Sequence, residues 1–378
     1  MNLLSALDLH TVKSLKQQVW PSKSIGNLIE VYDVDQMIRE DAPHLVLISP
    51  GFQENDFFIY GVREQLYSLF TPSEHLRIAD SGSFCGNEND FFKAIGKIRE
   101  YGSIPIVISS HQSHTFYLYK SFFEDEQSVN ICSVDPFPDL STEAYEENEN
   151  HSWLTKIISH QPNFLFNYSL IAFQAYLSDP EMLKTLEDMN FDLHRLGRVR
   201  EFMEGCEPIL RNADILSFDV SAIRSSDFPA SENLEPNGLY AEEACRILRY
   251  SGLSNRLNAA IISGWSVSRK NDTDSSEKLV AQLIWHLADG IIARSPDGLI
   301  GNSDDYTIYN ISLENIQEEI IFFKNKKNGK WWMKVPMKSG LKSSKKRFHL
   351  IPCHIKDYQQ AMQGELPESW WQTYKKLI

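Results

Sequence analysis

The sequence predicts an α/β protein with three layers, α/β/α, in which helices cover both faces of a mainly parallel central sheet. Short apolar runs alternate with longer amphipathic stretches, and buried strands separated by helices give this pattern. Six such runs occur, at Leu45–Ile48, Ile104–Ile108, Val129–Val134, Phe164–Phe166, Ile215–Val220 and Ala259–Ile262. The 378 residues contain no internal repeat and no clean linker, so we expect one main domain rather than two.

Two of the intervening stretches have helical spacing. Residues Phe91–Tyr101 place apolar side chains one and four positions apart, and Gly102 ends this predicted helix. Residues Glu277–Ile292 have an apolar face and follow the polar segment Asp272–Ser276, which can cap a helix. Stretches of this kind supply the two helical layers.

The end of the chain differs from the rest. Residues Lys324–Leu350 contain ten Lys and Arg side chains and no acid. Within them, the pair Asn328-Gly329 separates the apolar runs Ile320–Phe323 and Trp331–Val335, which predicts a β-hairpin. This basic surface can meet a nucleic acid, but a charge run more often marks a solvated face of a hairpin packed on an acidic body.

The domain boundaries follow from this change in character. We expect the main α/β domain over residues 1–317, with residues 1–40 as an N-terminal extension. Residues 318–378 then form a basic hairpin and helix extension packed on the same domain. Trp370 and Trp371 are interpreted as anchors of the C-terminal helix.

Composition limits the functional classes. The net charge of −14 and the sequence pI near 5.3 argue against a general nucleic-acid binder, because such a surface repels phosphate backbones. Five scattered cysteines with no C-x-x-C pair indicate reduced thiols rather than a disulfide scaffold or a cysteine zinc site. No signal peptide and no membrane-length apolar stretch occur, so we expect a soluble, cytoplasmic protein without membrane contact.

Acidic side chains follow two of the predicted strands. Asp135 and Asp139 come after Val129–Val134, and Asp219 comes directly after Ile215–Phe218, the first four residues of the fifth run. Carboxyl ends of parallel strands share one edge of the sheet, and clustered carboxylates repel one another unless a cation or protons relieve them. This arrangement favours a site for a hard metal ion. The equal alternative is that Asp135 and Asp219 cap turns while Asp139 faces solvent.

Five segments occur in an order and spacing typical of one enzyme family. They are Ile104–Ser113, Ser133–Asp139, Ser217–Ile223, Phe228–Glu243 and Ser263–Asp272. The third, Ser-Phe-Asp-Val-Ser-Ala-Ile, is the most specific. From Leu45 to Ile292 the chain resembles the ureohydrolases, which include arginase, agmatinase and formiminoglutamase. The resemblance implies their α/β/α fold and, as expectations, their manganese chemistry and their tendency to form homo-oligomers.

The resemblance also assigns the family's metal ligands, which are two histidines and four aspartates around two Mn²⁺ ions. Three of the aspartates fall on Asp135, Asp139 and Asp219. The first histidine falls on Gln112, and the second falls on Phe137, which has no donor atom. The ligands of the second metal are therefore incomplete.

Three further positions complete the comparison. The fourth aspartate falls on Ser221, and the family's substrate-anchoring glutamate falls near Ser266. His151 resembles the position of a proton-shuttling histidine in arginases, and an exposed loop histidine is an equal alternative. The remaining ligands imply no metal or one weakly bound divalent cation held by carboxylates and the Gln112 amide. A one-residue slip would instead direct His111 to this site.

Three functional hypotheses follow. The first is a ureohydrolase-like protein without the dinuclear centre, a pseudoenzyme with a binding or regulatory role. The second is a hydrolase of a linear amidine or guanidine that uses one metal, with formiminoglutamate as the favoured substrate because the segment around Asp272 is most similar to that branch. The third is an interaction module that works through the basic C-terminal extension.

Overall fold

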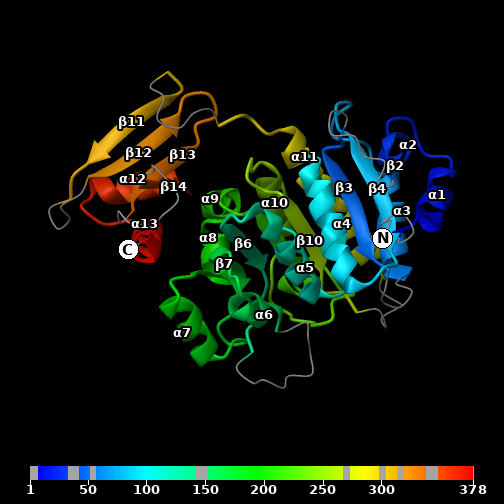
Figure 1. The fold of residues 1–378 in the computed structure, drawn as a ribbon, viewed down its shortest axis with the longest axis horizontal. Coiled ribbons are helices and arrows are strands. Elements are labelled where there is room, and N and C mark those ends of the chain that lie inside the picture. Colours follow the sequence, from blue (N-terminus) through cyan, green and yellow to red (C-terminus); the bar gives the residue numbers. More distant parts are fainter. Residues whose placement is uncertain are drawn as a thin grey trace.

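The computed structural model describes residues 7–32, 42–51, 57–141, 152–266, 273–297, 304–313, 319–337 and 348–377. In this part of the chain a large mixed sheet with helices on both faces lies beside a smaller antiparallel sheet (Figure 1). The central sheet has ten strands in the order β1-β4-β3-β5-β10-β9-β6-β7-β8, with β2 also paired to β4. All its pairings are parallel except that of β1 with β4.

The strands of the central sheet are β1 (Leu7–Asp8), β2 (Glu30–Val31), β3 (Leu45–Pro50), β4 (Ile78–Phe84), β5 (Ile104–Ile108), β6 (Val129–Val134), β7 (Leu165–Phe173), β8 (Asp192–Arg195), β9 (Ile215–Asp219) and β10 (Ala259–Ser263). The helices around it are α1 (His10–Lys16), α2 (Ile25–Leu28), α3 (Phe57–Ser68), α4 (Glu88–Glu100), α5 (Thr115–Lys120), α6 (Trp153–Ser159), α7 (Pro180–Asp188), α8 (Leu196–Glu201), α9 (Cys206–Arg211), α10 (Ala241–Gly252) and α11 (Thr273–Ile292). The predicted three-layer α/β/α fold is confirmed, and all six apolar runs are strands.

Alternate residues of the central strands pack on opposite faces, as the two-residue period of a strand requires. Leu45 and Leu47 of β3 lie in one apolar cluster with side chains of α3, α10 and α11. Val46 and Ile48 of the same strand lie in a second cluster with side chains of α4 and α5. Each face of the sheet therefore has its own core, and the strands between them are buried on both sides.

Strand β4 was not predicted, because Asp80 and its neighbours are polar. In the structure Asp80 is fully buried and forms an ion pair with Arg63 of α3, with Nε and Oδ2 2.8 Å apart. The Tyr67 hydroxyl and the Gly82 backbone N–H also donate to this carboxylate. A buried charge with its hydrogen bonds complete is tolerated in a core, so the strand does not need an apolar sequence.

The described part of the N-terminal extension belongs to the central sheet rather than lying outside it. β1 pairs with β4 in antiparallel register, and β2 pairs with β4 in parallel register. Every described helix is too short or too polar to cross a membrane.

The C-terminal part forms a four-stranded antiparallel sheet in sequential order. Its elements are β11 (Tyr306–Ile311), β12 (Ile320–Asn325), β13 (Trp331–Pro336), β14 (Phe348–Cys353), α12 (Ile355–Met362) and α13 (Glu368–Leu377). The predicted hairpin is confirmed as β12 and β13, joined through Asn328 and Gly329, which has a positive φ of 71°. The sheet begins at β11, however, so the boundary that we set at residue 318 falls between two of its strands.

The two C-terminal tryptophans behave differently. Trp370 is 1% exposed, and its indole Nε1 donates to the Lys334 carbonyl over 2.8 Å, so it anchors α13 as predicted. Trp371 is 45% exposed, so the same prediction for this residue is wrong. Because neighbouring residues on a helix point about 100° apart, only one of them can face the sheet.

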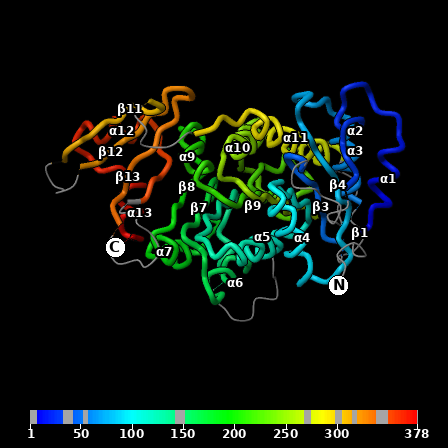
Figure 2. The backbone as a smooth tube through the Cα atoms, turned by 45° about the horizontal axis from the view of Figure 1, so that its top comes forward, coloured from blue at the N-terminus to red at the C-terminus, as the bar shows by residue number. Residues whose placement is uncertain are grey.

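The small sheet docks on the α9 side of the central sheet, at the other end of the molecule from α1 and α2 (Figure 2). Arg211 of α9 is 4% exposed and donates to the backbone carbonyls of Trp331 and Cys353. Its guanidinium also lies 4.4 Å from the ring centre of Trp332 and pairs with Glu207. One buried cation therefore connects α9 to two strands of the small sheet.

Candidate functional site

The carboxyl ends of β5, β6, β9 and β10 meet at one edge of the central sheet. Val134 of β6 lies beside Phe218 of β9, so Asp135 and Asp219 occupy equivalent positions at the ends of neighbouring strands. Ser263 at the end of β10 pairs with Asp219. The fold thus brings together the strand ends at which the sequence predicted a site, as expected for a parallel sheet.

Gln112 also lies at this edge, after the end of β5. It lies in a short 3₁₀ helix, Gln112–His114, that follows β5, and it is 3% exposed. Its Nε2 donates to the hydroxyls of Ser217, over 3.2 Å, and Ser133, over 3.4 Å. These serines precede Asp219 and Asp135 by two residues, so serine and aspartate share one face of each strand. The Gln112 side chain therefore belongs to the carboxylate cluster.

Each of the three aspartates accepts a hydrogen bond from a nearby donor of the chain. Asp135 Oδ1 accepts from the Phe137 backbone N–H over 3.2 Å, and Asp219 Oδ1 accepts from the Ser221 N–H over 2.7 Å. These two bonds are turn caps, as one of the two sequence interpretations predicted.

Asp139 differs from both. It is 1% exposed, so the prediction that it faces solvent is wrong. Its Oδ2 accepts from the Trp153 indole Nε1 over 2.6 Å, and Trp153 is fully buried at the start of α6. The position of Asp139 therefore depends on a residue that sequence motifs did not single out.

The cluster raises the proton affinity of its carboxylates. Burial raises the pKa of Asp135 well above the ordinary value, and the charges of Asp139 and Asp219 raise it further. Burial likewise raises the pKa of Asp139 well above the ordinary value, with a second contribution from Asp219. Because these three acids are buried beside one another, protons or a bound cation would relieve their repulsion.

The structure describes two histidines near Gln112, namely His111 and His114. His114 is buried, and its Nδ1 lies 2.6 Å from the Ser109 hydroxyl. Burial, together with the charge of His111, lowers the pKa of His114 to about 3, so this imidazole stays neutral. The His111 ring centre lies 6.0 Å from that of His114. His151 lies outside the described residues, as does Asp272.

Comparisons with solved structures identify the fold. Formiminoglutamase from Trypanosoma cruzi with Mn²⁺ superposes with a TM-score of 0.60 at 17% identity, over 69% of this chain and 97% of its own. Formimidoylglutamase from Bacillus subtilis gives 0.61 at 13% identity, over 74% and 96%. Arginase from Medicago truncatula gives 0.53 at 17% identity, over 66% and 87%.

The chain has the ureohydrolase fold. No protein-family model matches the sequence, and no curated protein matches it significantly. The ureohydrolase fold accounts for two thirds to three quarters of this chain and for nearly all of the two glutamase structures. The likeness at these identities is one of architecture, and the chemistry of the site has to be judged from its own residues.

The donors at the carboxyl edge do not fit the dinuclear manganese centre that the ureohydrolase resemblance implies. Phe137 has no donor atom in its side chain, and its backbone N–H donates to Asp135 Oδ1. Ser221 is buried with its hydroxyl unpartnered, a neutral group where the resemblance expects an anion. Among the residues that the structure describes, no group of three or more His, Cys, Asp and Glu side chains is arranged to hold a metal ion.

The position expected for the substrate-anchoring glutamate is equally altered. Ser266 is half-buried and donates its backbone N–H to the Ala230 carbonyl over 2.9 Å, beside the bridge between Ser231 and Trp265. A serine at this point is too short and too weak a partner for a guanidinium or ammonium group.

The site contains one further constraint that the motifs did not reveal. Gly264 follows β10 with a φ of 98°, and a Cβ atom there would lie 2.1 Å from Asp219 Oδ1. Glycine is therefore required both by the backbone and by the adjacent carboxylate. The position of Gly264 directly after an apolar run is the sequence feature that could have drawn attention to it. No feature of the local sequence could have shown that Trp153 bonds to Asp139.

Proposed function

We propose that this chain retains the ureohydrolase fold without dinuclear manganese chemistry, and that it acts by binding rather than by hydrolysis. The observation that carries the proposal is the donor set at the carboxyl edge. It contains three carboxylates and one amide, while Phe137 and Ser221 stand where two further metal ligands are expected.

The physical reason is the way in which two metal ions activate water. Two cations that share a hydroxide lower its pKa and stabilise the charge that develops on the substrate. Neither a phenyl ring nor a neutral hydroxyl can supply the missing ligands. Two of the remaining groups also form hydrogen bonds within the chain, since Gln112 donates to two serines and Asp139 accepts from an indole.

The test combines a metal measurement with an activity assay. The full chain is incubated with Mn²⁺, freed of excess metal and measured for bound manganese per chain by mass spectrometry. We expect no stoichiometric metal and no turnover of formiminoglutamate, agmatine or arginine. Two bound ions per chain together with turnover of any of these would contradict the proposal.

A variant that restores the ligands provides the matched control. Gln112→His, Phe137→His and Ser221→Asp together would recreate two imidazoles and a fourth carboxylate. If the missing ligands are the cause, this triple variant binds manganese where the unmodified chain does not. Circular dichroism of both proteins establishes that the substitutions leave the fold intact.

A single-metal hydrolase is the second candidate, and one observation favours it. Asp135 Oδ2 is buried without a hydrogen-bond partner in the described structure, so one carboxylate oxygen remains open to a cation. One bound ion per chain, with turnover that Asp139→Ala abolishes, would establish this function in place of the first. Turnover that persists in Asp139→Ala would exclude it.

The described part of the basic extension gives less support to an interaction module. Lys327 lies 3.5 Å from Asp305, and Lys330 lies 3.6 Å from Asp297. These lysines thus face acids of the preceding segment, which agrees with a hairpin packed on an acidic body. Residues 338–347, which carry five of the ten basic side chains, lie outside the described residues.

A further inference from the structure

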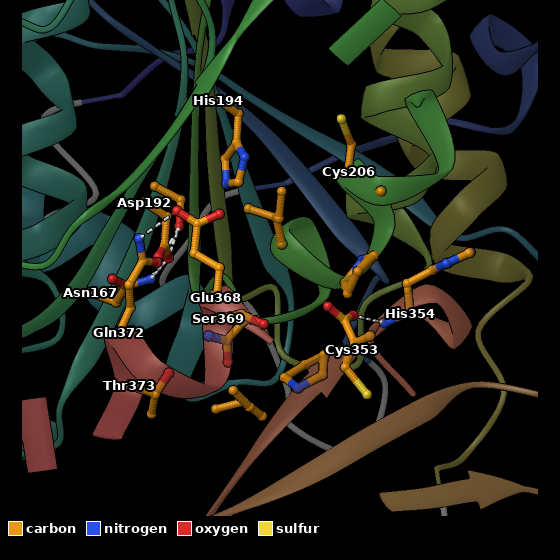
Figure 3. Close-up of a pocket in the computed structure, with 18 of the residues that line it drawn as sticks. Asn167, Asp192, His194, Cys206, Cys353, His354, Glu368, Ser369, Gln372 and Thr373 are labelled. Carbon is orange, nitrogen blue, oxygen red and sulfur yellow. Dashed lines mark hydrogen bonds between the residues drawn. The ribbon is translucent and has the colours of Figure 1, made fainter. Parts of the chain in front are cut away.

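A cavity of about 360 Å³ lies between the central sheet and the C-terminal unit. Its walls come from β7, β8, α8 and α9 on one side and from β14, α12 and α13 on the other (Figure 3). Asn167 lies near the beginning of β7, and Asp192 begins β8. The cavity therefore opens near the amino ends of these strands, away from the carboxylate cluster at the other edge of the sheet.

One end of the cavity is polar and carries an incompletely paired acid. Asp192 Oδ2 accepts from Asn167 Nδ2 over 2.7 Å and from the Ser169 hydroxyl over 3.0 Å. Asn167 and Ser169 are 5% and 4% exposed, so this hydrogen-bonded group is built into the wall. Asp192 has no ion-pair partner within 4.0 Å in the described structure, and its Oδ1 makes no hydrogen bond there. The carboxylate therefore retains bonding capacity.

A cation lies beside this acid. The ammonium of Lys376 in α13 donates to Asn167 Oδ1 and has no acid within 4.0 Å among the described residues. Burial lowers the pKa of Lys376, and Asp192 partly opposes this effect. Asn167 thus forms hydrogen bonds with both the Asp192 carboxylate and the Lys376 ammonium, and these two charged groups do not contact each other directly.

Two further polar groups in the wall are unpartnered. His194 Nε2 and Asn212 Oδ1 are buried, and neither has a hydrogen-bond partner in the described structure. Glu368 of α13 lies 3.5 Å from Arg198 and projects toward His194 and Asp192 in Figure 3. Buried polar atoms are almost always hydrogen-bonded, so unpartnered atoms around a cavity indicate a missing ligand or water.

Part of the remaining wall is apolar, and it lies beside charged and polar side chains that include Arg198, Lys356, Asp357 and Gln360. Val199 and Ile209 come from the central domain, and Phe166, Phe202 and Ile351 extend this surface. A small pocket with apolar walls and a few convergent polar groups is typical of a small-molecule site. At its polar end, Asp192 and Lys376 together match a ligand with one cationic and one anionic group, since a single charge would leave one of them without a partner.

We propose that this cavity binds a free α-amino acid with an apolar side chain. Its carboxylate would meet Lys376, its ammonium would meet Asp192 and Glu368, and its side chain would lie against the apolar wall. Because both units of the protein line the cavity, the bound amino acid would also strengthen their docking. This site is independent of the function proposed above, since it shares no residue with the carboxylate cluster.

The experiment measures binding to the full chain by calorimetry and by the shift in melting temperature. Leucine and phenylalanine are the probes, each at up to about 10 mM. Leucinamide, which lacks the carboxylate, and N-acetylleucine, which lacks the ammonium, are the comparators. We expect saturable binding of at least one amino acid, and binding of each comparator weaker by about tenfold or more.

Two variants and one control locate the site. Lys376→Met removes the cation but keeps an unbranched side chain, and we expect it to weaken binding by about tenfold. Asp192→Asn retains an acceptor for Asn167 and Ser169 and should have a similar effect even if the first variant folds poorly. Lys375→Met alters an exposed neighbour on the same helix and should bind as the unmodified chain does.

Three results would overturn the proposal. They are an absence of saturable binding of either amino acid, equal binding of both comparators, and unchanged binding in a folded Asp192→Asn variant. Neither manganese content nor hydrolysis enters this test, so its outcome leaves the function proposed for the carboxyl edge untouched.

Discussion

The two ends of the central sheet treat their polar groups differently. At the carboxyl edge, Asp139 and Asp219 accept hydrogen bonds from donors of the chain itself, and Gln112 donates to two serine hydroxyls. At the amino end of β7 and β8, His194 Nε2 and one oxygen of Asp192 are left without a partner beside a cavity. Asp135 Oδ2, Ser221 Oγ and Ser263 Oγ at the carboxyl edge also lack a hydrogen-bond partner in the described structure. The two regions therefore differ in the charges beside such atoms, which are three carboxylates at the carboxyl edge and both an acid and a cation at the cavity.

This difference separates two criteria that are often combined. A motif shows where a family places its ligands, whereas an unpartnered buried atom shows where this chain can still accept one. The carboxyl edge meets the first criterion and, through Asp135 Oδ2, Ser221 Oγ and Ser263 Oγ, also the second. The cavity meets the second criterion without any motif. Three substitutions in or near these regions would test how much their contacts contribute to the stability of the protein.

The largest effect is expected at Arg211, on which the wall of the cavity depends. Arg211→Met removes the cation that donates to the Trp331 and Cys353 carbonyls and leaves Glu207 without its partner. We expect the free energy of unfolding to fall by about 3 kcal/mol, measured by urea denaturation.

An exposed arginine serves as the control. Arg246 pairs with Glu204, and the two side chains are 47% and 54% exposed, so Arg246→Met should change stability by less than about 1 kcal/mol. Similar effects of both substitutions would mean that Arg211 does not hold the two sheets together.

A smaller effect is expected at Gly264, on the carboxyl edge. Gly264→Ala strains a backbone with a φ of 98° and places a Cβ 2.1 Å from Asp219 Oδ1, so we expect a loss of about 2–3 kcal/mol. In an Asp219→Ala background the carboxylate is absent and the loss should shrink to about 1–2 kcal/mol. Equal losses in both backgrounds would mean that Asp219 does not restrict this glycine.

The smallest effect is a gain in stability from Asp139→Asn. The folded-state pKa of Asp139 is raised, so between the ordinary aspartate pKa and that raised value the folded chain holds more protons than the unfolded chain. The stability of the unmodified protein therefore falls as pH rises through this interval. Asparagine cannot ionise and still accepts from Trp153. We expect the melting temperature to rise by roughly 2–4 °C at about pH 8, with little change near pH 4.

A change in melting temperature of the opposite sign would also be informative. A lower melting temperature for Asp139→Asn at about pH 8 would mean that the Asp139 carboxylate holds a cation in the purified protein. Removal of that cation with a chelator should then abolish the difference between the two proteins. This outcome would favour the single-metal hydrolase.

The sequence predicts much of the central sheet because apolar runs dominate it. It does not predict β4, where Asp80 is buried by an ion pair with Arg63, a residue of α3. Nor does it predict β8, a short edge strand with the polar sequence Asp-Leu-His-Arg. Both strands are stabilised by partners elsewhere in the sequence, so the hydrophobicity of their own residues does not predict them.

The same reason explains what sequence reasoning found at the two sites. Asp135 and Asp219 lie at the ends of apolar strands, so a rule about strand ends was enough to place them together. Gln112 was assigned to the same site through the ureohydrolase resemblance. Trp153 donates to Asp139 from 14 positions further along the chain, and no sequence pattern pairs the two. The cavity joins Asn167 to Lys376 across 209 positions, and only the docked fold could reveal it.

The strand order has a consequence for how the protein is made. In the central sheet β5 lies beside β10, which follows it by about 150 residues, so this pairing can form only after most of the α/β chain has been synthesised. The small sheet pairs β11, β12, β13 and β14 in sequential order, and such local contacts form quickly. We therefore expect the apolar surfaces of the first strands to stay partly exposed in the nascent chain until β10 has been synthesised. Translation speed and chaperone access before residue 263 should then govern the yield of folded protein more than any event near the C-terminus.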